Sequence, residues 1–203
     1  MGTDFSSIDA SFGFQPYGNV LRAQLYAVAT APTIAIYTND IVIHGGTGAS
    51  TPIGYLPIIE DAQAADSYAF ILGSVLECFD ENMMPVSYIA ALEAGNSTIA
   101  GYVLVADHPN QLFIAQEDGG ANAITASEMG FNIDLISTNA GNTYTGIGGQ
   151  ELDSDSAGAA AALQFKLIRP HEDDTIDVDA TPYNRWIVQV NEHFYHDVVG
   201  IGI

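Results

Sequence analysis

The chain has 203 residues, enough for one large or two small β domains, and 48% of them are hydrophobic, enough for a packed core. Its 4 Lys and Arg against 25 Asp and Glu give a formal net charge of -21, which argues against binding nucleic acid or an anionic membrane surface through a basic patch. The single cysteine, Cys78, excludes an intrachain disulfide, and no apolar run reaches the roughly 20 residues of a membrane-spanning helix.

Residues 1–19 are predicted to form an extended N-terminal arm. The segment is rich in Ser, Gly and Asn, yet it carries four aromatic side chains that a solvated tail would not need. Two interpretations stay open: the rings fold back on the body of the same chain, or they anchor the arm on a neighbouring subunit, since aromatic side chains dominate interface energetics. The candidate interface residues are Phe5, Phe12, Phe14 and Tyr17.

Residues 20–97 form the predicted N-terminal β region, in which short apolar runs alternate with turn residues. Residues 44–51, HGGTGAST, are predicted to be a flexible loop, and they lack the Gly-Lys-Ser/Thr ending of a phosphate-binding loop. Pro85 as a first helical residue and Gly95 as a C-cap favour a short helix or turn. Cys78 lies in an apolar run and is expected to be a buried, inert thiol.

Residues 98–203 form the predicted C-terminal β domain, where several segments alternate apolar and polar residues with the period of a strand. Thr125 and Glu128 have the spacing of a capping box, which predicts a single helical turn. Because no segment carries three turns of amphipathic helix, the sequence predicts an all-β fold. We expect β-barrel or sandwich-like lobes with the extended N-terminal arm.

Residues 106–120, ADHPNQLFIAQEDGG, gather an acid, an imidazole and amides in one stretch. A nucleophilic triad also needs a Ser or Cys in a strained elbow, and no G-x-S-x-G motif occurs in the sequence. Pro109 directly follows the Asp107-His108 pair, which is typical of a tight turn between two strands. With 25 acidic residues, some pair of carboxylates will be neighbours by chance. We therefore predict no catalytic residue and expect the protein not to be an enzyme.

Metal sites are weakly indicated. His193 and His196 are three residues apart, an offset that places their side chains on opposite faces of a strand. Hard oxygen ligands in flexible loops suit Ca²⁺, but neither acidic loop matches the EF-hand pattern, and a solvated acidic face is the preferred interpretation. No metal and no cofactor are predicted. The two acidic loops carry Glu151, Asp153 and Asp155, and Asp173, Asp174, Asp177 and Asp179.

Four segments carry a resemblance to a known family: GYVLVADHPNQLFIAQEDGGA, NIDLI, TGIGGQELDSDSAGAAAALQFKLIRPHEDD and NRWIVQVNEHFY. They resemble the cement, or decoration, proteins of tailed-bacteriophage capsids, in which a Val-Ala-Asp-Asp-Pro-Asn-Gln-like turn precedes a strand ending in an acidic corner. His108 stands where that group usually has an Asp. The resemblance is specific over residues 98–197 and looser before them, in GFQPYG, YTNDIVIHGG and FILGSVLECFD.

The resemblance implies a structural role. The protein would bind the outer surface of an icosahedral capsid as a trimer, with the major capsid protein as partner, and would stabilise contacts between capsomers in the virion. Its negative charge would face outward or meet positive patches on the shell. Two alternatives stay open: a carbohydrate-binding knob or fibre domain with Tyr144 or Tyr183 as aromatic platform, and a calcium-dependent hydrolase.

Overall fold

The structure is a computed structural model, and it describes residues 9–29, 32, 34–62, 70–91, 99–137, 139–172 and 182–196. Strands dominate these residues, with two three-residue 3-10 helices, so the all-β prediction is confirmed. No helix within these ranges is long and apolar enough to cross a membrane.

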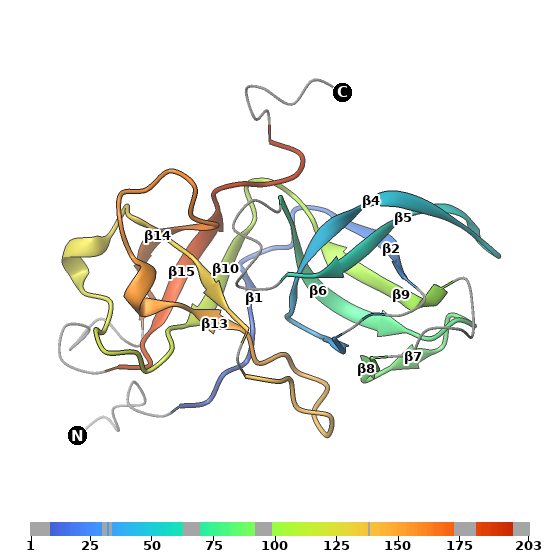
Figure 1. Ribbon diagram of the computed structural model, residues 1–203, viewed down its shortest axis with the longest axis horizontal. Coiled ribbons are helices and arrows are strands. Elements are labelled where there is room, and N and C mark those ends of the chain that lie inside the picture. The colour runs from blue at the N-terminus through green and yellow to red at the C-terminus, as the bar shows by residue number, and fades with distance from the viewer. Residues whose placement is uncertain are drawn as a thin grey trace.

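Five strands of the first half close into a barrel (Figure 1). Neighbouring strands follow the order β4-β5-β2-β9-β6, and β6 pairs again with β4, which completes the ring. All pairs are antiparallel except the parallel pair of β2 with β5. Closure leaves no free edge in the ring itself, whereas the outer part of the β4–β5 hairpin, residues 48–57, pairs with no third strand among the described residues. The strands are β2 (Ala23–Ala29), β4 (Ile41–Thr51), β5 (Gly54–Asp61), β6 (Ile71–Phe79) and β9 (Ile99–Ala106).

One apolar cluster draws side chains from all five of these strands, as the interior of a small barrel requires. The short paired strands β3 (Ile36–Tyr37) and β8 (Tyr88–Ile89) add Ile36 and Ile89 to the same cluster. Cys78 belongs to it and is 1% exposed, and burial raises the pKa of its thiol to about 12. The expectation of a buried, inert thiol is therefore confirmed.

The prediction of a loop at residues 44–51 is wrong, because β4 continues to Thr51 and pairs with β5 in a long hairpin. The register shifts between His44 and Gly48, and Gly46 within this bulge has a φ of 74°, which only glycine adopts readily. Glycines that suggest flexibility in the sequence thus form a bulge here. Backbone hydrogen bonds, which do not depend on side chains, hold the hairpin together.

The prediction of a helix or turn beginning at Pro85 is also wrong for the part that the structure describes. Pro85 and Val86 form the short strand β7 (Pro85–Val86), which pairs with Phe79 and Cys78 of β6. A proline lacks the N–H of a ladder bond, and an edge strand tolerates that loss. Gly95, the predicted C-cap, lies outside the described residues.

The second half of the chain forms an antiparallel sheet of five strands in the order β1-β10-β15-β14-β11. A two-stranded sheet of β12 and β13 accompanies it. The 3-10 helix η1 (Ala126–Glu128) occupies the predicted helical turn, and the Glu128 carboxylate accepts the Thr125 N–H at 2.7 Å. The strands are β1 (Gln15–Tyr17), β10 (Leu112–Gln116), β11 (Asn132–Ile133), β12 (Leu135–Ile136), β13 (Glu151–Leu152), β14 (Phe165–Pro170) and β15 (Arg185–Val190), and the second short helix is η2 (Ser154–Ser156).

The structure divides the chain differently from the predicted boundaries at residues 19 and 98. β9 follows residue 98, yet it pairs with β2 and β6 and so belongs to the barrel. The chain passes to the second sheet only after Ala106. Residues 15–17 of the predicted arm are not separate from the body either, because they form β1, the edge strand of the second sheet, and pair with β10.

A shared core joins the barrel to the second sheet. Ile41 and Ile71 of the barrel strands pack in one cluster with Phe113, Phe165 and Trp186 of the second sheet. Phe14 completes this cluster; its ring is 0% exposed and stacks on Phe165 with 4.6 Å between ring centroids. The segment before β1 therefore contributes to the same core as strands from both halves of the chain.

Replacing Phe14 with Ala removes a buried ring from this shared core. We expect the Phe14→Ala variant to lose about 3–5 kcal/mol of unfolding free energy, measured by urea denaturation. This loss is the sum of the hydrophobic free energy of the removed ring and the cost of the cavity that it leaves. Phe12→Ala is the matched control: its ring is half-buried, so the loss should be clearly smaller. Equal losses for the two variants would contradict the placement of Phe14.

Candidate functional site

The Asp107-His108 pair begins a tight turn, as predicted. The His108 carbonyl accepts the Gln111 N–H at 2.9 Å, and the His108 Nδ1 accepts the Asn110 N–H at 3.1 Å. The fully buried Asp107 carboxylate accepts hydrogen bonds from the Arg22 Nε at 2.8 Å and the Tyr26 hydroxyl at 2.5 Å. Both polar side chains of the pair thus have structural partners that organise the end of β9.

Two of the four candidate interface residues have clear partners within the same chain. Phe14 lies in the shared core, so its ring is not available to a neighbouring subunit; here the fold-back interpretation holds. The Tyr17 hydroxyl donates to the Glu172 carboxylate at 2.7 Å, and the Arg169 guanidinium lies 5.7 Å from the Tyr17 ring centroid.

The other two candidates stay open as contacts with a neighbour. Phe12 is half-buried, and its carbonyl accepts a hydrogen bond from the Asn39 side chain at 3.0 Å. Phe5 lies outside the described residues. Within the arm, the interface prediction therefore now rests on the rings of Phe5 and Phe12.

The acidic and histidine residues considered as metal ligands do not form a cluster in the described part of the chain. Glu151 is buried, whereas Asp155 is exposed and its carboxylate accepts from the Asn122 side chain at 2.9 Å. His193 is buried and its Nδ1 accepts the Tyr195 N–H at 3.0 Å. Within the described ranges, no group of three His, Cys, Asp or Glu residues has a geometry that could hold a metal ion. The acidic residues 173–179 fall outside those ranges.

Three further carboxyl groups among the described residues are buried, which the sequence analysis did not predict. Burial raises the pKa of Asp40, Glu117 and Glu151 to about 7. Glu117 has a structural role, since it accepts the Ile124 N–H at 2.6 Å and the Asn184 side-chain amide at 2.8 Å. In a chain with 25 acidic residues, no local pattern distinguishes these three from acids on the surface.

Glu151 makes the stability of the fold depend on pH. One carboxylate oxygen accepts a hydrogen bond from Asn139, whereas the other, Oε1, is buried without a partner in the described structure. Burial raises its pKa from 4.5 to about 7, so between these values the folded chain holds a proton that the unfolded chain releases. The contribution of Glu151 to stability is therefore fully present below pH about 4.5 and is lost as the pH rises through about 7.

Glu151→Gln tests this pH dependence, because Gln removes the charge and keeps an oxygen to accept from Asn139. We expect its melting temperature at pH 8 to exceed that of the original chain, with a smaller difference at pH 5. Thermal denaturation at both pH values provides the measurement. Glu60→Gln is the control for the removal of one carboxyl group, because Glu60 is exposed on β5. A variant that is less stable at pH 8 would contradict this explanation.

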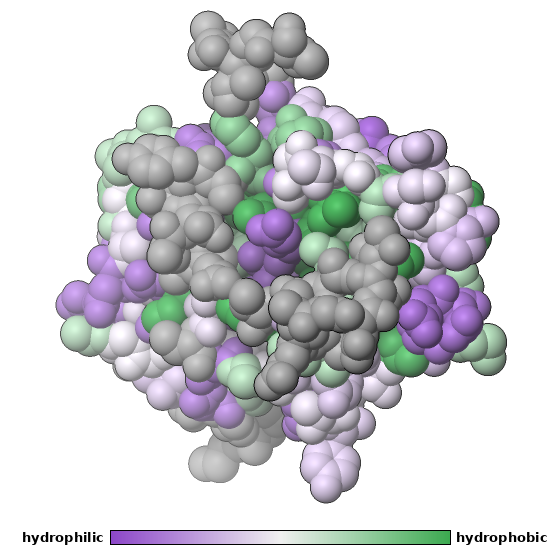
Figure 2. Space-filling model, turned by 45° about the vertical axis from the view of Figure 1, so that its right-hand side comes forward, coloured by the Kyte–Doolittle hydropathy of each residue, from purple (hydrophilic) through white to green (hydrophobic). Residues whose placement is uncertain are grey.

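One of several exposed apolar features is the turn of the β4–β5 hairpin, residues 51–55, which we call the hairpin tip. Ile53 is 50% exposed and Tyr55 is 85% exposed. The Thr51 hydroxyl fixes the turn, since it donates to the Gly54 carbonyl at 2.7 Å. The hairpin extends away from the rest of the barrel (Figure 1). Elsewhere, apolar side chains lie in several separate areas of the face shown in Figure 2.

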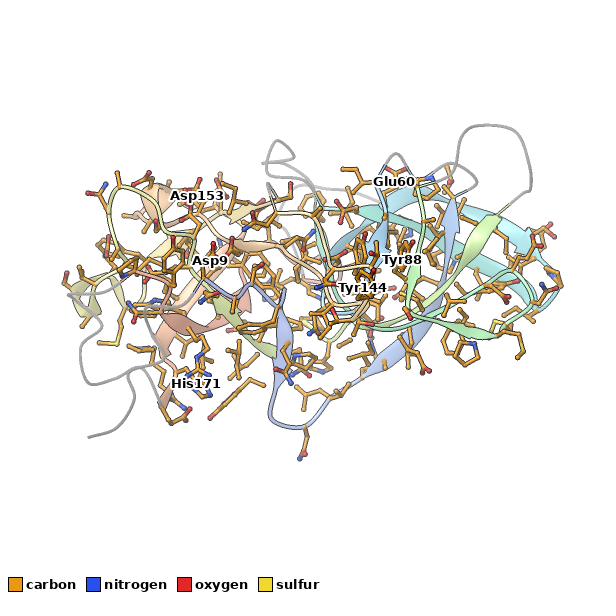
Figure 3. The ribbon with its side chains drawn as sticks, turned by 90° about the horizontal axis from the view of Figure 1, so that it is seen from below. Asp9, Glu60, Tyr88, Tyr144, Asp153 and His171 are labelled. Carbon is orange, nitrogen blue, oxygen red and sulfur yellow. The ribbon has the colours of Figure 1, made fainter. Side chains whose placement is uncertain are left out.

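Tyr144 is the most exposed aromatic residue among those described, at 98%, and it lies in the turn between β12 and β13 (Figure 3). The Asn142 side chain fixes this turn by accepting the Tyr144 N–H at 2.9 Å. Tyr183, the other residue considered as an aromatic platform, is only partly exposed, and its ring packs directly against Gly119.

No protein-family model, curated protein or solved structure matches this chain. The candidate functional site is therefore defined by geometry: it is the hairpin tip, with Ile53 and Tyr55 held out from a closed barrel.

Proposed function

We propose that this protein is a cement, or decoration, protein of a tailed-bacteriophage virion. In this proposal it binds the outer surface of the icosahedral capsid as a homotrimer, contacts the major capsid protein and stabilises the junctions between capsomers. The observation that carries the proposal is the hairpin tip, and the resemblance of residues 98–197 to such proteins supplies the identity of the partner.

The hairpin tip has the properties of a protein-binding element. A tyrosine that is 85% exposed and an isoleucine that is 50% exposed keep apolar surface in water, which favours their burial against a partner. Tyrosine is among the residues that contribute most to binding energy at interfaces. Because the hairpin continues two strands of a closed barrel, its conformation is set before binding, which lowers the entropic cost of association.

The charge of the chain favours a basic partner. A net charge of -21 would speed encounter with a positively charged capsid surface. Binding to the shell should therefore weaken as salt screens this attraction. Many copies on one shell would add avidity to individually moderate contacts.

Tyr55→Ala tests the hairpin tip directly, in co-sedimentation with empty capsids of the same virus. We expect about a tenfold loss of affinity, because removal of an interface tyrosine commonly costs more than about 1 kcal/mol. The melting temperature should not change, since the ring is 85% exposed. Tyr144→Ala is the matched control: this ring is 98% exposed at another turn, so capsid binding should persist. Unchanged binding by Tyr55→Ala, or equal losses in both variants, would contradict the role of the tip.

Deletion of residues 1–8 tests the remaining part of the arm prediction. This truncation removes Phe5 but keeps Phe14 and the whole of β1, so the protein should fold with a nearly unchanged melting temperature. We expect weaker decoration of capsids in the same co-sedimentation assay. Deleting residues 1–19 is unsuitable, because it also removes a core ring and an edge strand. Decoration at full strength by the shorter truncation would rule out residues 1–8 as an anchor.

A further inference from the structure

A pocket of about 540 Å³ lies between two segments that are far apart in the sequence. One wall is the segment before β1, with Asp9, Ser11 and Phe12, and the other is the chain between β12 and β13, with Asn139, Asn142 and Thr145. Figure 3 shows Asp9 on the first segment and Tyr144 on the second. Its volume falls within the range of about 300–1,000 Å³ that is usual for small-molecule sites, but most of its lining residues are exposed, so it is an open depression of the surface.

The wall between β12 and β13 is held to the barrel by backbone hydrogen bonds. The Gly146 carbonyl accepts the Thr38 N–H at 3.0 Å, and the Gly148 N–H donates to the Thr38 carbonyl at 2.7 Å. Gly146 has a φ of 71°, and an added Cβ would lie only 2.4 Å from the Ser87 carbonyl oxygen, so this close approach requires glycine.

The wall before β1 is also fixed to the body of the protein. The Ala10 N–H donates to the Gln116 side chain at 3.1 Å, and the Asn39 side chain donates to the Phe12 carbonyl at 3.0 Å. The pocket is therefore preformed and needs no rearrangement to accept a ligand, which lowers the cost of binding.

The pocket presents the chemistry that a polyhydroxylated ligand requires. The Asp9 carboxylate accepts hydrogen bonds, and the Ser11 hydroxyl can donate and accept. The further polar residues that line the pocket are Asn139, Asn142 and Thr145. Asn139 donates its amide N–H to Glu151, which orients the side chain and leaves Oδ1 as an acceptor. Phe12 supplies a half-buried aromatic surface for the apolar C–H face of a sugar ring.

Charge opposes an anionic ligand, and the lining residues do not suit a metal ion. No Lys, Arg or His is among the described residues that line the pocket, and the net charge of -21 opposes an anionic ligand. A divalent cation would need several oxygen ligands, but Asp9 is the one carboxylate in this lining. The described residues likewise contain no group of three acids or histidines placed for a metal ion.

We infer that this pocket binds a neutral sugar unit of a glycan. Tyr144 adjoins the pocket-lining Asn142 and Thr145 in sequence, and its ring is 98% exposed, so it can stack on a second sugar unit outside the pocket. Such a site would let a particle that carries many copies hold weakly to a glycan-coated surface through avidity. This inference goes beyond the proposed capsid role and does not depend on it.

Saturation-transfer NMR with the full chain tests the site, using the methyl glycosides of glucose, galactose, mannose and N-acetylglucosamine as probes. We expect transfer to at least one of them. Asp9→Ala should weaken its binding about tenfold through loss of a charged hydrogen-bond acceptor. Ala140→Trp should abolish binding by filling the pocket, because Ala140 lines it and is exposed. Glu60→Ala, an exposed acid on β5, is the matched control and should bind as the original chain does.

Three results would overturn the inference: no transfer to any of the four glycosides, transfer that Ala140→Trp leaves intact, or stronger binding of the anionic sugar N-acetylneuraminic acid. The melting temperature of each variant shows whether it is folded. If Ala140→Trp does not fold, Asp9→Ala still tests the site. The same variants assayed on capsids separate the two proposals, since Asp9→Ala should lose sugar binding and retain capsid binding.

Discussion

The buried Asp107 carboxylate is the interaction on which the arrangement of the two halves depends. It is 0% exposed, and a charge in that position costs several kcal/mol unless partners compensate it. Arg22 supplies two hydrogen bonds, from Nε to the carboxylate and from Nη2 to the Asp107 carbonyl, both at 2.8 Å, and the Tyr26 hydroxyl supplies a third. Tyr195 closes the network, because its hydroxyl lies 3.0 Å from that of Tyr26 and its ring lies beneath the Arg22 guanidinium.

These four residues come from different parts of the fold. Arg22 immediately precedes β2, Asp107 immediately follows β9, and Tyr195 follows β15. The network therefore links the barrel to the end of the second sheet where the chain crosses between them. Together with the shared core, it makes the barrel a firm base for the β4–β5 hairpin. An exposed tip on such a base can bind a large, fixed surface without first having to be ordered.

Local sequence patterns predicted the fold class and several details but not the connections between distant segments. Strand-period alternation indicated an all-β chain, the spacing of Thr125 and Glu128 located a helical turn, and Pro109 indicated the turn after Asp107. Barrel closure and the pairing of β1 with β10 were not predictable in this way. Each depends on the register between strands far apart in the sequence, which no local period encodes.

The same contrast applies to the proposed binding surfaces. Tyr144 was identifiable as a loop aromatic because polar and glycine residues surround it. Tyr55 was not, because the glycines of residues 44–51 suggested a loop in place of the outer half of β4, which pairs with β5 to form the tip. The same composition left the position of Phe14 open between the body of the chain and a neighbouring subunit, because Ser, Gly and Asn surround a ring that stacks on Phe165. A residue's neighbours in sequence report its local flexibility, whereas its burial depends on what the fold packs against it.

The central claim is that this chain binds the outer surface of a capsid through the hairpin tip. Electron cryo-microscopy of empty capsids of the same virus, incubated with the purified protein, tests it most directly. The proposal predicts added density on the outer surface at capsomer junctions, with the barrel placed so that Ile53 and Tyr55 lie against the shell. A bare shell, or added density in which the hairpin tip points into solvent, would contradict it.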